Sequence, residues 1–191
     1  MMVAGIDEAG RGPLAGPVYA AAVIIAAERV PPGVADSKQL SETAREKLFP
    51  LIMAAAVAVG IGKASVAEID RLNIHHASLL AMSRAFKSLG APCDFAYVDG
   101  LHLPRIECPG RAVVDGDALV PMISAASIIA KVSRDRVMRE LDAAFPGYGW
   151  ARNKGYATAE HRQALVRLGP TRHHRKSFEP VRRAFAARKA R

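Results

Sequence analysis

The stretch VAGIDEAGRGPLAGPVYAAAVII, residues 3–25, sets the pattern of the fold. Two apolar runs, at residues 2–6 and 17–26, are typical of buried strands, and the segment GRGPLAGP between them is rich in turn-forming Gly and Pro. Two adjacent acids, Asp7 and Glu8, follow the first run and come directly before this flexible segment. In a chain of formal charge +9, that placement raises the question of what the acids bind.

Strand-like and helix-like segments alternate along the rest of the chain. Three further strands are predicted by apolar runs at residues 57–65, 94–98 and 111–114. Helical patterns cover residues 40–56, 66–89, 120–145 and 158–168, and a last helix starts near Glu179. The order predicts an α/β fold, a mixed sheet with helices on its faces.

The first helical segment carries two boundary signals. Thr43 and Glu46 have the spacing of a capping box, in which each side chain bonds to the other's backbone amide. Pro50 lacks an amide hydrogen, so we expect it to kink or end this helix.

Length and composition favour one globular domain in the cytoplasm. The chain has 191 residues and no repeat at solenoid or propeller periods. No apolar run approaches the roughly 18 residues of a membrane-spanning helix, and acids appear too early for a signal peptide. Cys93 and Cys108 show no metal-ligand spacing, so we expect ordinary small apolar side chains in a reducing compartment.

The positive charge is concentrated near the C-terminus. Residues 150–191 hold twelve Lys and Arg against two acids, whereas residues 1–149 hold fifteen against sixteen. A near-neutral body with a basic end is typical of a protein that binds a polyanion such as a phosphate backbone, although a merely soluble basic protein would show it too.

Acidic residues follow three of the predicted strands. Besides Asp7 and Glu8, Asp99 ends YVDG, and Asp115 and Asp117 lie in VVDGD. If these strand ends lie side by side, the carboxylates repel one another unless a cation neutralises them. Oxygen ligands without His or Cys favour Mg²⁺ or Mn²⁺, and two such ions about 4 Å apart can act on a phosphodiester.

Three other motifs fit contacts with nucleic acid. Gly10 and Gly12 would let the backbone approach a sugar closely enough to meet a 2′-hydroxyl, although a plain tight turn explains their spacing equally well. Ser37 and Lys38 of DSKQL suit either a phosphate contact or a helix cap. Tyr156, beside Lys154 in NKGYAT, fits base stacking with a cation on the phosphate, or a place in the core.

Two other classes of site are disfavoured. Neither GRGPLAG nor VGIGKAS matches a phosphate loop, so we expect no nucleotide cofactor. The histidines lack zinc spacing and are interpreted as surface or structural groups, with a phosphate contact suggested for the basic run that contains His173, His174, Arg175 and Lys176.

Assembled, these segments closely resemble the bacterial ribonuclease HII family, the type 2 ribonucleases H. The resemblance rests on GIDEAGRGPLAGPV, DSKQLSETAREKLF, YVDG, GDALVPMISAASIIAKVSRDR, NKGYATAEH and HRKSFEPV, which run in the family's order to about Val181. It implies a ribonuclease H-like five-stranded core over residues 1–150 and a basic helical extension over residues 151–191 packed on it. It also implies metal-dependent cleavage of RNA in RNA–DNA hybrids and at ribonucleotides embedded in duplex DNA, leaving 3′-hydroxyl and 5′-phosphate ends.

The resemblance also assigns roles to individual residues. By their motifs, Asp7, Glu8, Asp99 and Asp117 are similar to the family's metal ligands, and Asp135 to an accessory carboxylate. Gly10, Arg11 and Gly12 resemble the element that reads the 2′-hydroxyl, and Tyr156 resembles the ring that packs on the adjoining deoxyribose. Asp115 departs from the family, which commonly has Lys there, and leaves open which aspartate binds metal.

Two rival functions remain compatible with these residues. In each case we expect the protein to bind nucleic acid and no membrane. A DNA nuclease or strand-transfer enzyme would use the same acids on all-DNA duplex. A non-catalytic nucleic-acid-binding protein would use the basic end, but strand-end acids would then repel the phosphates. We expect the protein to be a monomer.

Overall fold

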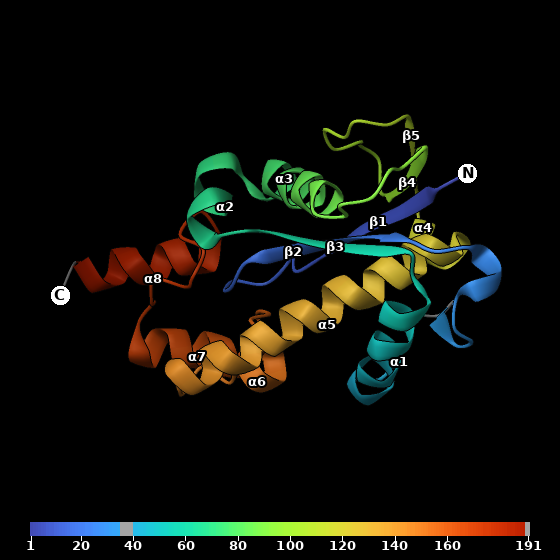
Figure 1. The fold of residues 1–191 in the computed structure, drawn as a ribbon. Helices are drawn as coiled ribbons and strands as arrows, with labels where there is room; N and C mark the ends of the chain where they lie inside the picture. Colours follow the sequence, from blue (N-terminus) through green and yellow to red (C-terminus); the bar gives the residue numbers. More distant parts are fainter. Residues whose placement is uncertain (35–39, 190–191) are drawn as a thin grey trace.

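The computed structural model describes residues 1–34 and 40–189, which form a mixed five-stranded sheet between two layers of helices (Figure 1). The strands are β1 (Val3–Ala9), β2 (Val18–Ile24), β3 (Ala58–Ala64), β4 (Phe95–Asp99) and β5 (Gly110–Val113). Their spatial order is β3-β2-β1-β4-β5. β1 pairs antiparallel with β2 and parallel with β4, so the predicted mixed sheet is confirmed and β1 lies at its centre.

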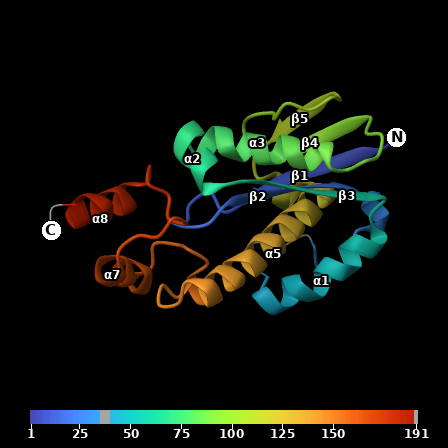
Figure 2. The same ribbon diagram turned by 60° about the vertical axis from the view of Figure 1, so that its left-hand side comes forward.

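Helices cover both faces of the sheet. The main ones are α1 (Glu42–Ala55), α2 (Val66–Leu72), α3 (Ile74–Lys87), α5 (Pro121–Ala144), α7 (Ala159–Leu168) and α8 (Glu179–Lys189). Short ones are η1 (Ala27–Arg29), α4 (Gly116–Leu119) and α6 (Trp150–Asn153). Figure 2 shows α2 and α3 on one face and α1 and α5 on the other, with α7 and α8 gathered at the end far from the N-terminus.

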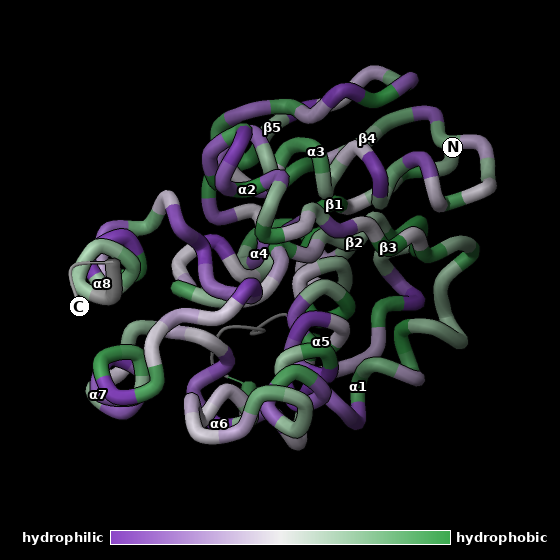
Figure 3. Tube along the Cα trace, turned by 90° about the vertical axis from the view of Figure 1, so that its left-hand side faces the viewer, coloured by the Kyte–Doolittle hydropathy of each residue, from purple (hydrophilic) through white to green (hydrophobic). Residues whose placement is uncertain are grey.

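Alternation along the strands creates two cores. Ala4 and Ile6 of β1 pack with Ala81 and Ala85 on the α3 face, and half-buried Cys93 and Cys108 join that cluster as apolar side chains. Ala9 of β1 packs on the opposite face, among α5 residues such as Ile128 and Ile129. Figure 3 shows α5 beside the strands with hydrophobic stretches in green and hydrophilic ones in purple along the helix.

Three glycines let the helices touch the strands at the main chain. A Cβ on Gly60 or Gly62 would lie 2.1 or 2.2 Å from a carbonyl oxygen of α3. A Cβ on Gly5 would lie 2.1 Å from the carbonyl carbon of Met122 in α5. The two helical layers are therefore seated directly on the sheet backbone.

Two expectations about helix boundaries were wrong, and a third was wrong in part. The cap of α1 is Ser41, whose side chain accepts from the Ala44 amide, rather than a Thr43–Glu46 box. Of the kink or end expected at Pro50, the end does not occur there, because α1 continues past Pro50 to Ala55. Residues 66–89 form two helices because Asn73 takes a left-handed φ of 66° and caps α3 by accepting from the His76 amide.

The capping box expected in the first helix is found at the start of the second one. A capping box does occur, but it joins Ser65 and Glu68 at the start of α2. No described helix combines the length and apolar character needed to cross a membrane.

Candidate active site

The acid pair lies inside the central strand rather than after it. β1 continues to Ala9 because β2 offers pairing partners along its whole length, with Asp7 opposite Ala21 and Glu8 opposite Ala20. Successive side chains leave a strand on opposite faces. Asp7 accordingly shares the α5 face and accepts a hydrogen bond from the Ser127 side chain, whereas Glu8 leaves on the other face and lies 3.5 Å from the guanidinium of Arg11.

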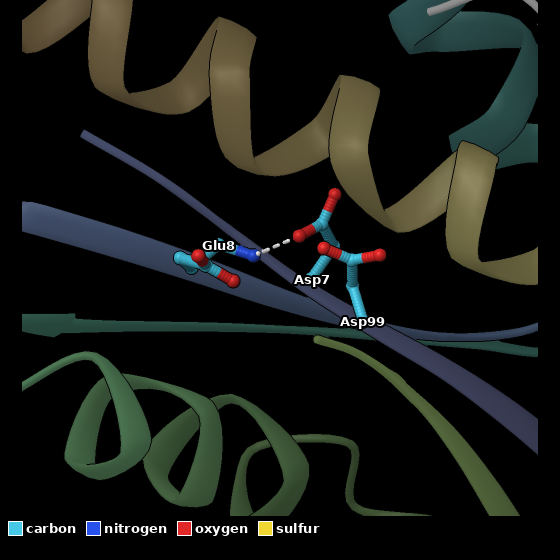
Figure 4. Close-up of side chains that lie close together, drawn as sticks. All are labelled: Asp7, Glu8 and Asp99. Atoms are coloured by element: carbon cyan, nitrogen blue, oxygen red, sulfur yellow. Dashed lines mark hydrogen bonds between the residues drawn. The ribbon is translucent and has the colours of Figure 1, made fainter. Parts of the chain in front are cut away.

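Asp99 completes a cluster of three carboxylates, the carboxylate triad (Asp7, Glu8 and Asp99). It is the last residue of β4, which runs parallel to β1, so the carboxyl ends of both strands lie at the same edge of the sheet. One oxygen from each residue lies within 4.8 Å of the other two. Figure 4 shows the three side chains close together beside α5. Segments more than ninety residues apart in the sequence thus share one site.

Burial and the neighbouring carboxylates disfavour charge on Asp7 and Glu8. The pKa of Asp7 is raised well above its usual value, first by burial and then by the charges of Glu8 and Asp99, although the Glu8 amide donates to its Oδ1 at 2.6 Å. Burial also raises the pKa of Glu8, and Arg11 offsets part of this effect. A protein gains nothing in stability from such an arrangement, so its place where β1 and β4 end indicates a cation-dependent function.

The donor set fits a hard divalent cation. All three side chains offer carboxylate oxygens, and no His or Cys belongs to the triad. Mg²⁺ and Mn²⁺ prefer such oxygen ligands, whereas zinc sites use His and Cys more often. The repulsion that raises the Asp7 pKa would be relieved by the same ion.

Asp117 lies beside the triad but outside the group within 4.8 Å. It is buried in the short helix α4, and its amide donates to Asp99 Oδ1 at 3.3 Å. Asp115 is exposed at the left-handed residue that precedes this helix, with a φ of 52°. The structure thus places Asp117, rather than Asp115, next to the carboxylates.

The structure places Asp135 away from the triad. Its buried carboxylate accepts from the Lys131 ammonium at 2.6 Å, one turn earlier on α5. Lys131 lines the cleft described next, so Asp135 contacts a residue of the site through this ion pair.

A cleft of about 360 Å³ runs from Glu8 along the glycine segment that follows β1. Gly10, Arg11, Gly12 and Tyr156 all line it, and a Cβ on Gly12 would lie 3.5 Å from a ring carbon of Tyr156. The Tyr156 side chain is 43% exposed, so its ring is available for stacking instead of filling the core. The glycines and the tyrosine, 144 or more residues apart in the sequence, therefore lie side by side in the lining of one cleft.

Several predicted phosphate contacts do not lie at the surface. Lys154 is buried, and its ammonium lies 3.1 Å from Glu42, so the exposed cation expected beside Tyr156 is not there. His174 and Arg175 are fully buried, so the phosphate contact suggested for them was wrong. Ser37 and Lys38 fall outside the described residues.

The cleft also contains residues that sequence reasoning missed. Arg45, Ser127 and Lys131 line it. Arg134 and Arg175 lie beneath it with fully buried side chains. The only signal in the sequence was an Arg between Ser and Asp in a helix otherwise rich in small apolar residues, which does not by itself distinguish a buried cation from a surface one.

Comparison with known proteins matches this geometry to one family. The family model described as Ribonuclease HII matches residues 4–185. The curated Ribonuclease HII of Rhodospirillum rubrum is 58% identical over 189 residues, covering 96% of this chain and 87% of that protein.

Solved structures agree with this assignment. The ribonuclease H2 of Pyrococcus horikoshii OT3 superposes with a TM-score of 0.85 and 28% identity, covering all of both chains. A ribonuclease HIII titled Bst-RNase HIII, crystallised in complex with Mn²⁺, has a TM-score of 0.79 at 21% identity, covering 100% of this chain and 71% of that one, which shows a shared fold. The chain belongs to the ribonuclease HII family, the metal-dependent endonucleases that act on the RNA of RNA–DNA hybrids.

Proposed function

We propose that this protein hydrolyses phosphodiesters at ribonucleotides, both in RNA–DNA hybrids and where single ribonucleotides are embedded in duplex DNA, leaving 3′-hydroxyl and 5′-phosphate ends. The observation that carries the proposal is the convergence of three carboxylates from two adjacent strands beside a cleft lined with glycine backbone. Neither a DNA nuclease nor a passive binding protein needs bare glycine backbone next to an exposed aromatic ring in the cleft beside the carboxylates.

The proposed metal ligands are the triad and Asp117. Two Mg²⁺ or Mn²⁺ ions held there would supply activation of water and neutralisation of charge on the departing oxygen. The chain's own contribution is to hold the oxygens in place: Ser127 and the Glu8 amide fix Asp7, and the Asp117 amide fixes Asp99. These contacts restrict the carboxylates to a narrow range of positions before any ion or substrate arrives.

The proposed substrate contacts lie along the cleft. Peptide groups of Gly10, Arg11 and Gly12 would meet the 2′-hydroxyl, and the ring of Tyr156 would pack on the adjoining deoxyribose. Arg45 and Lys131 line the same cleft and would offset phosphate charge. In this arrangement a nucleotide without the 2′-hydroxyl is held less firmly in line with the carboxylates, which gives the preference for ribonucleotides.

The test uses a DNA duplex that contains one ribonucleotide, with an all-DNA duplex of the same sequence as the control. We expect one nick at the phosphodiester next to the ribonucleotide in Mg²⁺ or Mn²⁺, none in EDTA, and none in the control. Asp99→Asn should bind the duplex nearly as well and lose cleavage by at least about a thousandfold. Equal cutting of the all-DNA duplex would support the rival DNA nuclease instead.

The same proposal includes a monomer that acts in the cytoplasm. It also keeps residues 1–150 as the catalytic core and residues 151–191 as a basic helical extension. Ser37 and Lys38 remain predicted phosphate contacts.

A further inference from the structure

Two buried cations lie beneath the glycine segment between β1 and β2. We call residues 10–17 the recognition loop. Arg134 comes from α5, and Arg175 comes from the segment that precedes α8; the side chain of each has no exposed surface. Together they connect the middle and the end of the chain to a loop near its beginning.

Arg175 is bonded to three carbonyls of the recognition loop. Its Nη2 donates to Gly10 O at 2.6 Å, its Nη1 to Arg11 O at 2.8 Å and its Nε to Gly16 O at 2.9 Å. The backbone adds to this contact, because the Arg175 amide donates to Leu14 O and the Gly16 amide donates to His173 O. A single side chain thus spans both ends of the loop.

Arg134 connects the recognition loop to the loop that carries Tyr156. Its Nη2 donates to Ala15 O at 3.1 Å, its Nε to Pro17 O at 3.0 Å and its Nη1 to Lys154 O at 3.0 Å. Its guanidinium also lies directly under Gly10, where a Cβ would come within 2.0 Å of Nε. The two loops proposed to hold the sugar are therefore bonded to the same guanidinium.

Neither cation is arranged as an ordinary ion pair. Among the described residues, all six acceptors are backbone carbonyls. Burial lowers the pKa of Arg134 to about 10 and of Arg175 to about 9, so both remain charged at neutral pH. A buried charge is costly unless its surroundings are fixed around it, and a planar guanidinium with five N–H donors fixes several carbonyls at once.

We propose that Arg134 and Arg175 are positioning residues that hold the recognition loop in register with the carboxylate triad, so that they govern how fast a ribonucleotide is cut and how well it is distinguished from a deoxyribonucleotide. This inference rests on the proposed function of the loop. Gly10 is two residues from Glu8, and a displacement of about 1 Å near reacting groups can cost about a hundredfold in rate.

The first experiment replaces the guanidinium and then returns it. We expect Arg175→Ala to lower kcat on the single-ribonucleotide duplex about a hundredfold, while KM changes only a few-fold. Millimolar guanidinium chloride should restore kcat at least tenfold, and equal sodium or ammonium chloride should not. Arg172→Ala, an exposed neighbour, is the matched control and should keep wild-type kcat.

A second readout is independent of turnover. In EDTA, the ratio of Kd values for duplexes with and without the 2′-hydroxyl should move toward one in Arg175→Ala and stay unchanged in Arg172→Ala. If Arg175→Ala does not fold by circular dichroism, Arg175→Lys is used, because it keeps the charge but can reach fewer of the three carbonyls.

The outcomes separate this inference from the proposed function. A folded Arg175 variant with wild-type kcat and wild-type discrimination overturns the positioning role. Activity loss that follows only the unfolded fraction, or that guanidinium does not reverse, overturns it as well. If instead the wild-type protein cuts ribonucleotide and all-DNA duplexes equally, the proposed function fails before any variant is compared.

Discussion

At the residue scale, the triad shows what sequence could and could not predict. The acids were identified because each follows an apolar run, and Asp7, Glu8 and Asp99 do converge. What sequence missed is that Asp7 and Glu8 belong to the strand, because strand length depends on the pairing partner that β2 provides. A local pattern cannot show where such a partner ends, nor that Ser127, far along the chain, will bond to Asp7.

The buried charge on Asp7 gives a prediction about stability. Because burial and neighbouring acids raise its pKa, the ionised form costs folding free energy when no metal is bound. We expect Asp7→Asn to raise the melting temperature in EDTA by about 3–6 °C, at about 2–4 °C per kcal/mol for a chain of this size. The same variant should lose most of the extra stabilisation that millimolar Mg²⁺ gives the wild type.

Differential scanning calorimetry with and without Mg²⁺ measures both effects. Asp115→Asn is the matched control, because that carboxylate is exposed and outside the triad, and it should leave both melting temperatures unchanged. A lower melting temperature for Asp7→Asn in EDTA would show that the triad does not destabilise the metal-free fold.

At the element scale, the supports of the recognition loop come from helices and turns that sequence reasoning located but could not connect. The helices near 120–145 and 158–168 were predicted, and α5 and α7 are close to those bounds. Their buried polar contacts were not, because Arg134 and His161 look like ordinary surface residues on an amphipathic helix. Their burial depends on tertiary contacts, which a local pattern does not show. In the same way, the helical pattern over residues 66–89 did not show that the left-handed Asn73 divides it into two helices.

A buried chain of polar rings ties α7 to the segment that contains Arg175. Trp150 Nε1 donates to His161 Nε2 at 3.1 Å, and that same nitrogen lies 3.1 Å from His174 Nε2. The Thr171 amide donates to His174 Nδ1 at 2.9 Å, so His174 must carry its proton on Nε2 and donate to His161. Both rings are thus held neutral, and a second proton on either would break one of these hydrogen bonds.

This chain predicts acid sensitivity of folding. Burial and His161 lower the pKa of His174 to about 3, so in the window from about 6.5 down to 3 the unfolded state binds the proton and the folded state does not. The free energy of unfolding should therefore fall with decreasing pH below about 6.5, with His174 contributing up to about 1.4 kcal/mol per pH unit.

Urea unfolding at pH 7.5, 6.5, 5.5 and 5.0 measures the slope, which should be shallower in His174→Gln. Asp7 and Glu8, whose pKa values are raised, contribute with the opposite sign, but equally in both proteins. Exposed His102→Gln serves as the control. Identical slopes in the wild type and His174→Gln would show that His174 is protonated in the folded state.

At the scale of the whole molecule, the basic end is part of the fold as well as a source of charge. Val181 of α8 is fully buried with Leu14 and Leu165, and Arg175 holds the recognition loop. The sequence contains the charge asymmetry but does not show which basic side chains are exposed and which are buried. Removing residues 179–191 would therefore expose Leu14 and confuse a loss of charge with a loss of packing.

Charge neutralisation is the cleaner test of the polyanion contact. Arg182 and Arg183 are exposed on α8, so Arg182→Gln with Arg183→Gln should leave the melting temperature nearly unchanged. If both meet phosphates, the slope of log Kd against log salt concentration should flatten by up to about 0.9 for each contact. The Kd is measured by fluorescence anisotropy of a labelled duplex at salt concentrations from about 50 to about 300 mM. A slope equal to the wild type would remove these two residues from the interface.

The close approach of α5 to β1 has a consequence for how the chain tolerates change. The backbone of Met122 in α5 lies directly against Gly5 of β1. Gly5 is two residues before Asp7 in the strand, and Met122 is five residues before Ser127 in the helix. The distance between α5 and β1 at this point is set by contact between main-chain atoms. It therefore does not depend on the neighbouring core side chains, which can be exchanged for others of similar size. Changes in the composition of the core would consequently leave the position of Ser127 relative to Asp7 unaltered, whereas a single added methyl group at position 5 would push α5 away from β1 and disturb it.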